Sequence, residues 1–488
     1  MRGPGFASAA AAALFAVSGC TVGPDFQRPA APEATGYRAT ASAPPQQPAD
    51  QPADQHLVAG ADVPGQWWQL FRSAPIDALV ERALAANPNI AAARAALLAA
   101  QETAAAERGA FFPQVSAGLA PSRQRIADSL SSPLASPANP FSLHTAQLNI
   151  GYAPDIFGGT RRQVESLEAQ AEFQRFELAA ARLSLAANVV VAAVQEAALR
   201  GQIAALERIV AQGEELLTLT RRQLALGAIA EAAVAAQEAA LAQSRTALPP
   251  LRRQLAQNRD LLIALAGGYP DRELEQRFDL EHLELPQELP LSLPSRLVEQ
   301  LPDVRAAEAL AHSASAQVGV AFANRLPQFS INANIGSVAT SMGDLFRSGS
   351  GLWSVAGALT QPIFDGGTLR HRKSAADATY DQAMAQYRAT VIAAFQNVAD
   401  TLHALEQDAD ALRAATVAER ASSRSLAIAR RQVALGDISR LALLAAEQSY
   451  QQAVVAQVAA RANRYVDTVA LFQALGGGWW NTPEGSAE

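Results

Sequence analysis

The sequence predicts an α+β membrane protein built as an internal tandem duplication. Three observations support this fold class. Short motifs occur twice in the same order, for example around Pro88 and again around Pro302, an offset of 214 residues. Long stretches carry apolar residues at alternating spacings of three and four, which is typical of packed helices. Short stretches alternate strictly between apolar and polar residues, which is typical of strands that separate two environments.

Composition excludes several classes of protein. The 488 residues include 39 Lys and Arg against 46 Asp and Glu, a net charge of −7, whereas a nucleic-acid-binding protein is expected to carry a basic face. One cysteine rules out an intramolecular disulfide framework. The six histidines include no pair four residues apart, so no metal site is expected. There is also no nucleophile elbow or phosphate loop, so we expect neither an enzyme nor a bound cofactor.

The N-terminus predicts export and lipidation. The apolar stretch Phe6–Val17 is too short to span a bilayer but fits a signal peptide, which we place at residues 1–19. It ends in Val-Ser-Gly-Cys, which resembles the bacterial lipobox and predicts a covalent lipid on Cys20. An incidental cysteine after an ordinary signal is the alternative. Residues 20–66, rich in Pro, Ala and Gln from residue 28 on, are predicted to form a lipidated tether.

The duplicated motifs define two structural repeats, and a period of this length indicates two copies of one large unit. The motif Arg-Arg-Gln-x-Ala-Leu-Gly ends at Gly227 and again at Gly436. The first repeat is placed at 67–270, an equatorial linker at 271–295, the second repeat at 296–478 and a C-terminal tail at 479–488. For the first repeat we expect a helix at 76–110, strands at 113–121 and 145–154, and helices at 159–226 and 229–266. For the second we expect a helix at 296–324, strands at 327–338 and 351–363, and helices at 366–435 and 438–475.

The predicted helices are unusually long. A helix of about 68 residues extends roughly 100 Å, whereas globular helices usually stop near 20 residues. In each repeat the two shorter helices together match the long one, which suggests a wall of antiparallel helices. Pro249 and Pro250 are expected to kink or interrupt the helix at 229–266. An ordinary globular helix bundle is the alternative on periodicity alone.

The predicted strands have two contrasting faces. Between 328 and 336, Phe329, Ile331, Ala333 and Ile335 alternate with polar residues and glycine. A half-buried soluble sheet would show the same alternation, but the lipoprotein signal favours membrane-spanning strands. Four strands cannot close a barrel and unpaired edges are not tolerated in lipid. The chain is therefore expected to oligomerise, and three copies would supply twelve strands.

Several segments resemble one known family, the outer membrane factors (TolC/OprM-like channels), in particular their NodT-like lipoprotein branch. The matching segments are Cys20–Pro29, Trp67–Phe71, Leu79–Asn87, the two Arg-Arg-Gln-x-Ala-Leu-Gly turns and Ala474–Trp479.

This resemblance implies a homotrimer in which a twelve-stranded outer membrane β-barrel is continuous with a periplasmic α-helical barrel. It also implies a periplasmic adaptor (membrane fusion protein) and an inner membrane transporter, commonly of the RND type. The chain would then be the exit duct of a tripartite efflux pump. A type I secretion duct and a lipid-anchored coiled-coil scaffold without channel activity are the alternatives.

The candidate site residues fall into three groups. Those expected at strand-to-helix turns are Gly158, Gly159, Gly366 and Gly367. Those expected at hairpin tips that contact the adaptor are Gly227, Ala228, Ile229, Gly436 and Ile438. The resemblance implies a periplasmic gate just past the second turn, and the candidates there are Leu441, Arg440, Asp437, Arg430 and Arg431. In this chain Val433, Ala442 and Ala445 stand where the family often has tyrosine or acidic residues, so we expect an apolar Leu441 ring braced by ion pairs. A solvated tip is the alternative.

Overall fold

The computed structural model describes residues 21–30, 32, 36–37, 55–125 and 140–482, apart from the side chains of residues 440 and 441. The predicted signal peptide, Cys20 and the end of the C-terminal tail lie outside the described residues. The chain divides into two compact units. The first comprises Met1–Pro29, Ala96–Gln174 and Ala306–Arg388, and the second comprises Ala30–Ala95, Arg175–Arg305 and Ala389–Glu488.

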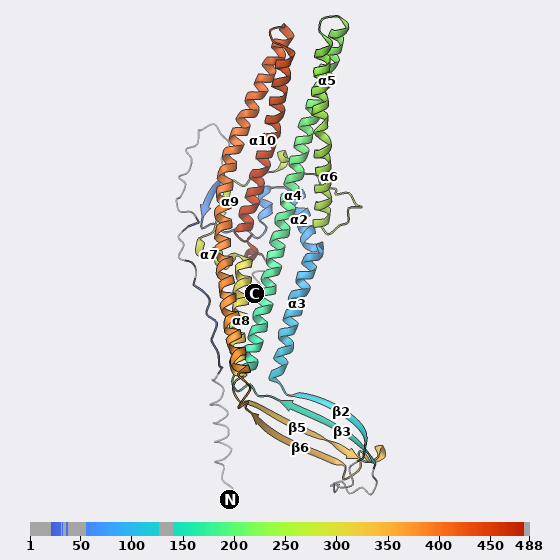
Figure 1. The fold of residues 1–488 in the computed structure, drawn as a ribbon, viewed down its shortest axis with the longest axis vertical. Coiled ribbons are helices and arrows are strands. Elements are labelled where there is room, and N and C mark those ends of the chain that lie inside the picture. The colour runs from blue at the N-terminus through green and yellow to red at the C-terminus, as the bar shows by residue number, and fades with distance from the viewer. Residues whose placement is uncertain (1–20, 31, 33–35, 38–54, 126–139, 483–488) are drawn as a thin grey trace. The chain divides into compact units, whose positions relative to one another are not determined.

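The first unit contains one antiparallel sheet of four strands in the order β2-β3-β5-β6 (Figure 1). Each repeat supplies one hairpin, and the middle pair, β3 and β5, joins the two hairpins. Among the described strands, β2 and β6 are each paired on one side only. The strands are β2 (Gln114–Gln124), β3 (Phe141–Tyr152), β5 (Gln328–Ala339) and β6 (Gly351–Thr360).

A long helix follows each strand hairpin. They are α4 (Gly159–Ala225), with 67 residues, and α9 (Thr368–Leu435), with 68 residues. One stretch of α4 is apolar enough to cross a membrane, but half of that stretch is buried inside the protein, as in a packed helix.

The helices that precede the strand hairpins are each broken once, which differs from the single helices predicted at 76–110 and 296–324. The first consists of α2 (Ala74–Ala86) and α3 (Pro88–Arg108), and the second of α7 (Pro294–Gln300) and α8 (Pro302–Ala323). Asn87 and Leu301 lie at the breaks in extended conformation, with ψ of 126° and 121°. Each precedes a proline, and the proline ring disfavours the helical conformation of the residue before it.

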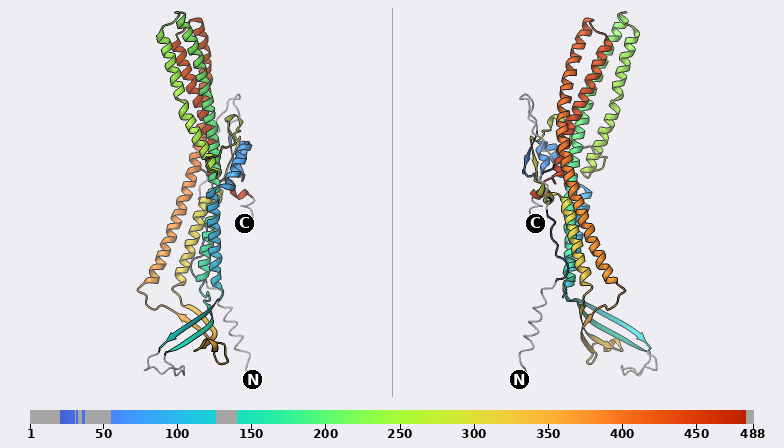
Figure 2. Two further views of the ribbon diagram at one scale, coloured as in Figure 1. Left: turned by 90° about the vertical axis from the view of Figure 1, so that its right-hand side faces the viewer. Right: turned by 60° about the vertical axis from the view of Figure 1, so that its left-hand side comes forward.

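The helices that return from the long ones differ between the repeats. In the first repeat α5 (Glu231–Thr246) and α6 (Leu248–Leu265) meet at Ala247, and Pro249 and Pro250 occupy the first turn of α6. Proline fits a first turn because no intrahelical bond requires its missing N–H. In the second repeat α10 (Arg440–Ala474) is continuous. Figure 2 shows from two sides that the residues of α9 and α10 run alongside each other, as do those of α4 and α5.

Two short strands and five short 3-10 helices were not predicted. β1 (His56–Ala59), from the expected tether, pairs in parallel with β4 (Glu288–Leu291), from the expected linker. The 3-10 helices are η1 (Trp67–Phe71), η2 (Gly109–Phe111), η3 (Leu280–His282), η4 (Met342–Asp344) and η5 (Trp479–Asn481).

An aromatic core in the second unit holds the ends of the two repeats together. Trp67 stacks on Phe472 with ring centroids 5.3 Å apart, and Phe71 contacts both Phe472 and Tyr465. The hydroxyl of Tyr465 donates a hydrogen bond of 2.6 Å to the carbonyl of Leu283. These large rings bury much apolar surface, and the buried hydroxyl is satisfied.

A buried carboxylate links α4, α6 and the linker in the same unit. The Glu196 side chain is 0% exposed, and its Oε1 lies 2.7 Å from Arg200 and 2.8 Å from Arg259. Arg259 also donates to the carbonyl of Leu274 at 2.6 Å. A buried charge of this kind is tolerated only because it is paired and hydrogen-bonded.

Replacing Glu196 with alanine should leave two half-buried guanidinium groups without their carboxylate. We expect Glu196→Ala to lower the free energy of unfolding by about 3 kcal/mol, measured by circular dichroism during thermal or denaturant unfolding in detergent. Glu207, which pairs with Arg252 at 2.7 Å but is 48% exposed, provides the control. Glu207→Ala should cost less than about 1 kcal/mol, and equal losses in the two variants would contradict a special role for Glu196.

Candidate channel wall and hairpin turns

The four-stranded sheet exposes an apolar face made by all four strands. One row across it consists of Ala117, Leu148, Ile335 and Trp353. The last three of these are exposed, and Trp353 is 76% accessible. A second row, displaced by two residues along each strand, contains Val115, Ile150, Ala333 and Val355. An apolar surface of this extent is costly in water and suits a lipid environment.

The opposite face of the sheet is polar. Its central row consists of Ser116, Asn149, Asn334 and Ser354, one from each strand. Asn149 also accepts a hydrogen bond of 2.9 Å from Gln147 on the same face. Side chains along a strand alternate between the two faces, so the sheet separates an apolar from an aqueous environment.

The glycines predicted at the strand-to-helix turns lie where the strand hairpins end and the long helices begin. Gly158, Gly366 and Gly367 have positive φ angles of 79°, 65° and 88°, which favour glycine. Gly159 is the first residue of α4, and a Cβ there would lie 3.1 Å from Ala323.

An aspartate caps each of these helix starts. Asp155 accepts hydrogen bonds from the backbone N–H groups of Thr160 and Arg161, both at 3.0 Å. Asp365 accepts from Leu369 and Gly367, both at 2.8 Å, and these bonds lower the pKa of its carboxyl. The two caps satisfy N–H groups that a helix leaves without partners.

The hairpin turns at Gly227 and Gly436 have the same backbone geometry. Ala228 N–H donates to Gln223 C=O at 2.9 Å and Gly227 N–H to Leu224 C=O at 2.9 Å, and the turn at Gly436 repeats both bonds. This is the Schellman motif, which requires positive φ at the glycine; the angles are 70° and 80°. The repeated Ala-Leu-Gly sequence therefore encodes one helix ending used twice.

The residues next to the two glycines differ in exposure. Leu226 and Leu435, which precede them, are 82% and 76% exposed. Ile229 and Ile438, predicted at adaptor-contacting tips, instead pack partly into the hydrophobic clusters of their own hairpins. The exposed leucines are thus the apolar groups most accessible at each described turn, and sequence reasoning had missed them.

The predicted gate residues differ in their surroundings: one makes contacts with other helices, two are exposed, and the side chains of two are not described. Arg430 donates to Gln212 at 2.6 Å and lies 3.6 Å from the Glu447 carboxylate. Burial raises the pKa of Glu447, and Arg430 opposes that rise. Arg431 and Asp437 are exposed. Arg440 begins α10 and Leu441 follows it, but their side chains are not described.

The sequence indicated that Arg430 could form an ion pair between helices, but it did not identify Glu447 as the partner. The two residues lie on opposite helices of the hairpin, 6 positions before and 11 positions after Gly436, so no local motif joins them. Val433, singled out because the family often has tyrosine there, packs into the cluster formed by Leu426, Ala429 and Leu443.

A pair of carboxyl groups lies farther along the same two helices. Asp467 on α10 shares a hydrogen bond with Asp408 on α9. Burial, followed by this hydrogen bond and the charge of Asp408, raises the pKa of Asp467 to about 6. Two such groups cannot both ionise freely at short range, so one keeps a proton below that pH.

The family model described as Outer membrane efflux protein matches residues 79–268 and 293–477. The chain belongs to this outer membrane efflux protein family. The "Probable efflux pump outer membrane protein TtgC" of Pseudomonas putida is 30% identical over 472 residues, covering 96% of this chain and 95% of that protein. Outer membrane protein OprJ of Pseudomonas aeruginosa is 29% identical, covering 98% and 97%. Among solved structures, the outer-membrane channel OprN superposes with a TM-score of 0.82 at 27% identity, covering 94% of this chain and 100% of that one.

Family membership confirms the fold class predicted from the sequence, an α+β outer membrane channel with a long helical part. The trimeric barrel of that fold class follows from the family. Family membership also confirms that the protein is located in the outer membrane and acts there as the exit channel of an efflux system. The relatives are channel proteins rather than enzymes.

The carboxyl pair makes stability depend on pH. The pKa of Asp467 is higher in the folded chain than its ordinary value of 3.8, so the folded state holds the proton more tightly. The free energy of unfolding should therefore fall as pH rises from about 4 to about 6 and stay level above. Asp408→Asn should reduce this fall, measured as melting temperature against pH. Asp410, exposed on the same helix and paired with Arg413, gives the control, since Asp410→Asn should leave the profile unchanged. An unaltered profile for Asp408→Asn would contradict the coupling.

Proposed function

We propose that three copies of this chain form the exit duct of a tripartite efflux pump. The duct would receive substrates from an inner membrane transporter, of the RND type, through a periplasmic adaptor and release them outside the cell. One observation carries the proposal: a two-faced sheet of four strands that is paired on one side only at β2 and β6. No metal or cofactor takes part; the covalent lipid on Cys20 is an anchor.

The unpaired edges give the reason for assembly. Backbone groups in hydrocarbon find no water, so a membrane-spanning sheet must close on itself. The smallest barrels have about eight strands, more than one chain provides. If β6 of one copy pairs with β2 of the next, three copies close a ring of twelve strands. The apolar face then meets lipid, and the row of Ser116, Asn149, Asn334 and Ser354 lines the water-filled passage.

The two hairpin turns are the proposed adaptor contacts. Each presents an exposed leucine, Leu226 or Leu435, beside the glycine that ends the helix. Burying such a leucine in a groove of the adaptor would remove apolar surface from water and so favour binding. Gly227, Ala228 and Gly436 supply the backbone of this surface, while Ile229 and Ile438 stabilise it from within.

Gating is proposed at the start of α10. Leu441 would form an apolar ring between the three copies, with Asp437, Arg440 and Arg431 nearby in sequence. The contact of Arg430 with Glu447 would hold the two helices of the second hairpin together near the gate, and its contact with Gln212 would join them to α4 of the first hairpin. Such a ring closes a pore because an apolar constriction excludes water and ions.

The edge pairing can be tested by crosslinking. Leu359 in β6 and Val115, Ala117 or Leu119 in β2 lie on the same apolar face of the sheet. With cysteine at 359 and at one of these three positions, oxidation should give covalent trimers on denaturing gels for at least one pair. A matched variant with cysteine at Leu148 in the central strand β3 should stay monomeric after denaturation. Failure of all three edge pairs would contradict the twelve-stranded ring.

The gate predicts a change in conductance. Leu441→Ala should raise the single-channel conductance of the reconstituted trimer in planar bilayers, because it removes the apolar constriction. Leu435→Ala, at the exposed residue before Gly436, should leave it unchanged. An unchanged closed state in Leu441→Ala would refute the gate. Monomers without conductance would favour the coiled-coil scaffold, and loss of an exported protein in a deletion strain, with drug sensitivity unchanged, would favour type I secretion.

A further inference from the structure

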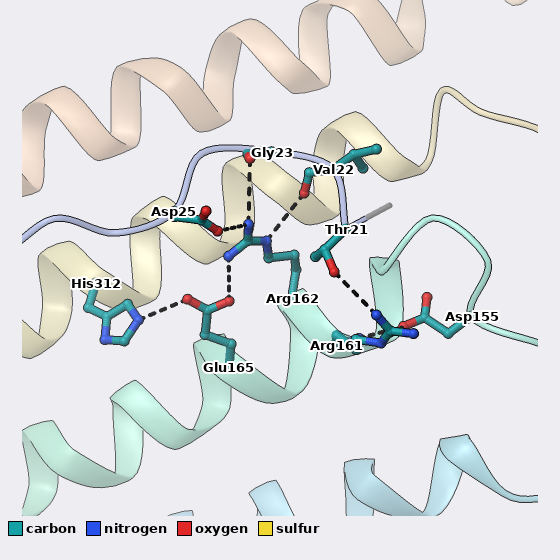
Figure 3. A network of polar contacts seen from close by, with 9 residues as sticks. All are labelled: Thr21, Val22, Gly23, Asp25, Asp155, Arg161, Arg162, Glu165 and His312. Carbon is teal, nitrogen blue, oxygen red and sulfur yellow. Dashed lines mark hydrogen bonds and ion pairs between the residues drawn. The ribbon is translucent and has the colours of Figure 1, made fainter. Parts of the chain in front are cut away.

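The N-terminal strap, Thr21–Pro29, is the described segment that follows Cys20 in the chain. It lies in the first unit, against the start of α4 and along α8 (Figure 3). Its contacts come from side chains with no role in the channel wall or at the hairpin turns.

One buried arginine is the centre of these contacts. The side chain of Arg162, on the first turn of α4, is only 5% exposed. Its guanidinium donates to the carbonyls of Val22 at 3.2 Å and Gly23 at 3.5 Å and to the Asp25 carboxylate at 2.5 Å. Figure 3 shows these three acceptors converging on one side of the group, with Glu165 at 2.7 Å on the other. A planar fork with five N–H groups can satisfy several acceptors at once, which a lysine cannot.

The strap also fits too closely for ordinary side chains at two points. Gly23 has φ of 97°, and a Cβ there would lie 2.5 Å from the Cα of Gly319 on α8. A Cβ on Gly319 would in turn lie 2.7 Å from Cγ of Arg162. Two glycines and one arginine therefore depend on one another for this packing.

The far end of the strap is held by α8. Phe26 stacks on His312 with ring centroids 4.6 Å apart, and His312 hydrogen-bonds Glu165 at 2.9 Å. Arg28 lies 3.0 Å from Glu308, which is itself buried. Specific groups thus bind the strap along its whole length.

The near end lies at the junction between β3 and α4. The N–H of Val22 donates to the carbonyl of Phe157 at 3.1 Å, and Arg161 donates to the Thr21 hydroxyl at 3.2 Å. A Cβ on Gly158 would lie 2.6 Å from Thr21. Thr21, which follows Cys20 directly in the sequence, is thus held at this junction by its own contacts.

The second copy of the motif lacks these features, which indicates a dedicated site. At the offset of 214 residues, Gly319 corresponds to Ala105, His312 to Leu98 and Glu308 to Arg94. In the repeated Gly-Gly-Thr segment, the residue corresponding to Arg162 is Arg370, which is exposed. The glycine, the imidazole and the acid that contact the strap are therefore replaced by other residues at the corresponding positions of the first repeat.

We propose that Arg162 is a positioning residue that captures the strap and thereby fixes the lipid predicted on Cys20 at the β3–α4 junction, where the membrane-spanning strands end. The lipid part of this proposal rests on the proposed membrane function. The capture itself depends only on contacts within the first unit.

Capture is tested by a crosslink between strap and groove. In a Phe26→Cys/His312→Cys variant, a short thiol-reactive crosslinker should join the two positions, quantified by mass spectrometry of the digested protein in detergent. Adding Arg162→Ala should lower the crosslinking rate about tenfold, since hydrogen bonds to a charged group are lost. Arg162→Lys should give an intermediate rate, because the charge toward Asp25 is kept while the fork is lost.

The matched control is Arg108→Ala. Arg108 forms an ion pair from α3 to Glu168 on α4 at 2.6 Å in the same unit and does not contact the strap. This variant should crosslink at the unmodified rate. If Arg162→Ala does not fold, as judged by helical circular dichroism, Asp25→Asn replaces it, because the Asp25 side chain is 89% exposed. Unchanged crosslinking in the folded Arg162 variants, or in Asp25→Asn, would overturn the proposal.

Placement of the lipid is tested in vesicles of phosphatidylethanolamine and phosphatidylglycerol. A fluorophore on Thr21→Cys should be quenched by headgroup-level nitroxide lipids, and Arg162→Ala should reduce that quenching. Equal quenching in both proteins would overturn the positioning role. Monomers without conductance would refute the proposed function but leave the crosslinking result intact, so the two failures are distinguishable.

Discussion

The unpaired backbone edges of β2 and β6 are the constraint on which the rest of this molecule depends. This sheet has one polar face and one apolar face that is exposed, which suits a boundary between water and lipid, and in lipid every backbone group must be paired. Four strands cannot meet that condition alone. The four strands of one chain are therefore one section of a barrel wall that only several copies can complete.

The sequence was informative where one physical requirement acts locally. Strand β5 was expected at 327–338 and spans Gln328–Ala339, because two solvents impose a period of two on its side chains. The hairpin turns were equally predictable, since only glycine readily supplies positive φ at Gly227 and Gly436. The breaks at Asn87 and Leu301 differ from the single helices predicted from the alanine-rich composition, because the proline after each residue disfavours its helical conformation.

Features that depend on distant contacts could not be predicted from local patterns. The four-residue strands β1 and β4 lie more than 200 residues apart in the chain and carry no alternation of their own. Arg430 was singled out, but its contacts with Gln212 and Glu447 depend on how the helices are rotated about their axes. For the same reason the sequence could not tell that Leu226 is exposed while Ile229 packs inward.

The duplication explains which residues stayed alike and which diverged. Prolines and glycines that define helix starts and ends recur in both repeats because each repeat needs the same backbone. Divergence at Ala105 and Gly319 follows from a different fact: Gly319 packs against the strap and Arg162, where a Cβ would lie 2.7 Å from Cγ of Arg162. In the other repeat Arg370 is exposed, and the nearby Ile363 and Phe364 are each 92% exposed. These exposed apolar side chains follow β6 directly, so the proposed trimer would bury them against the neighbouring copy or in lipid, and the open surface of one chain is then a consequence of assembly.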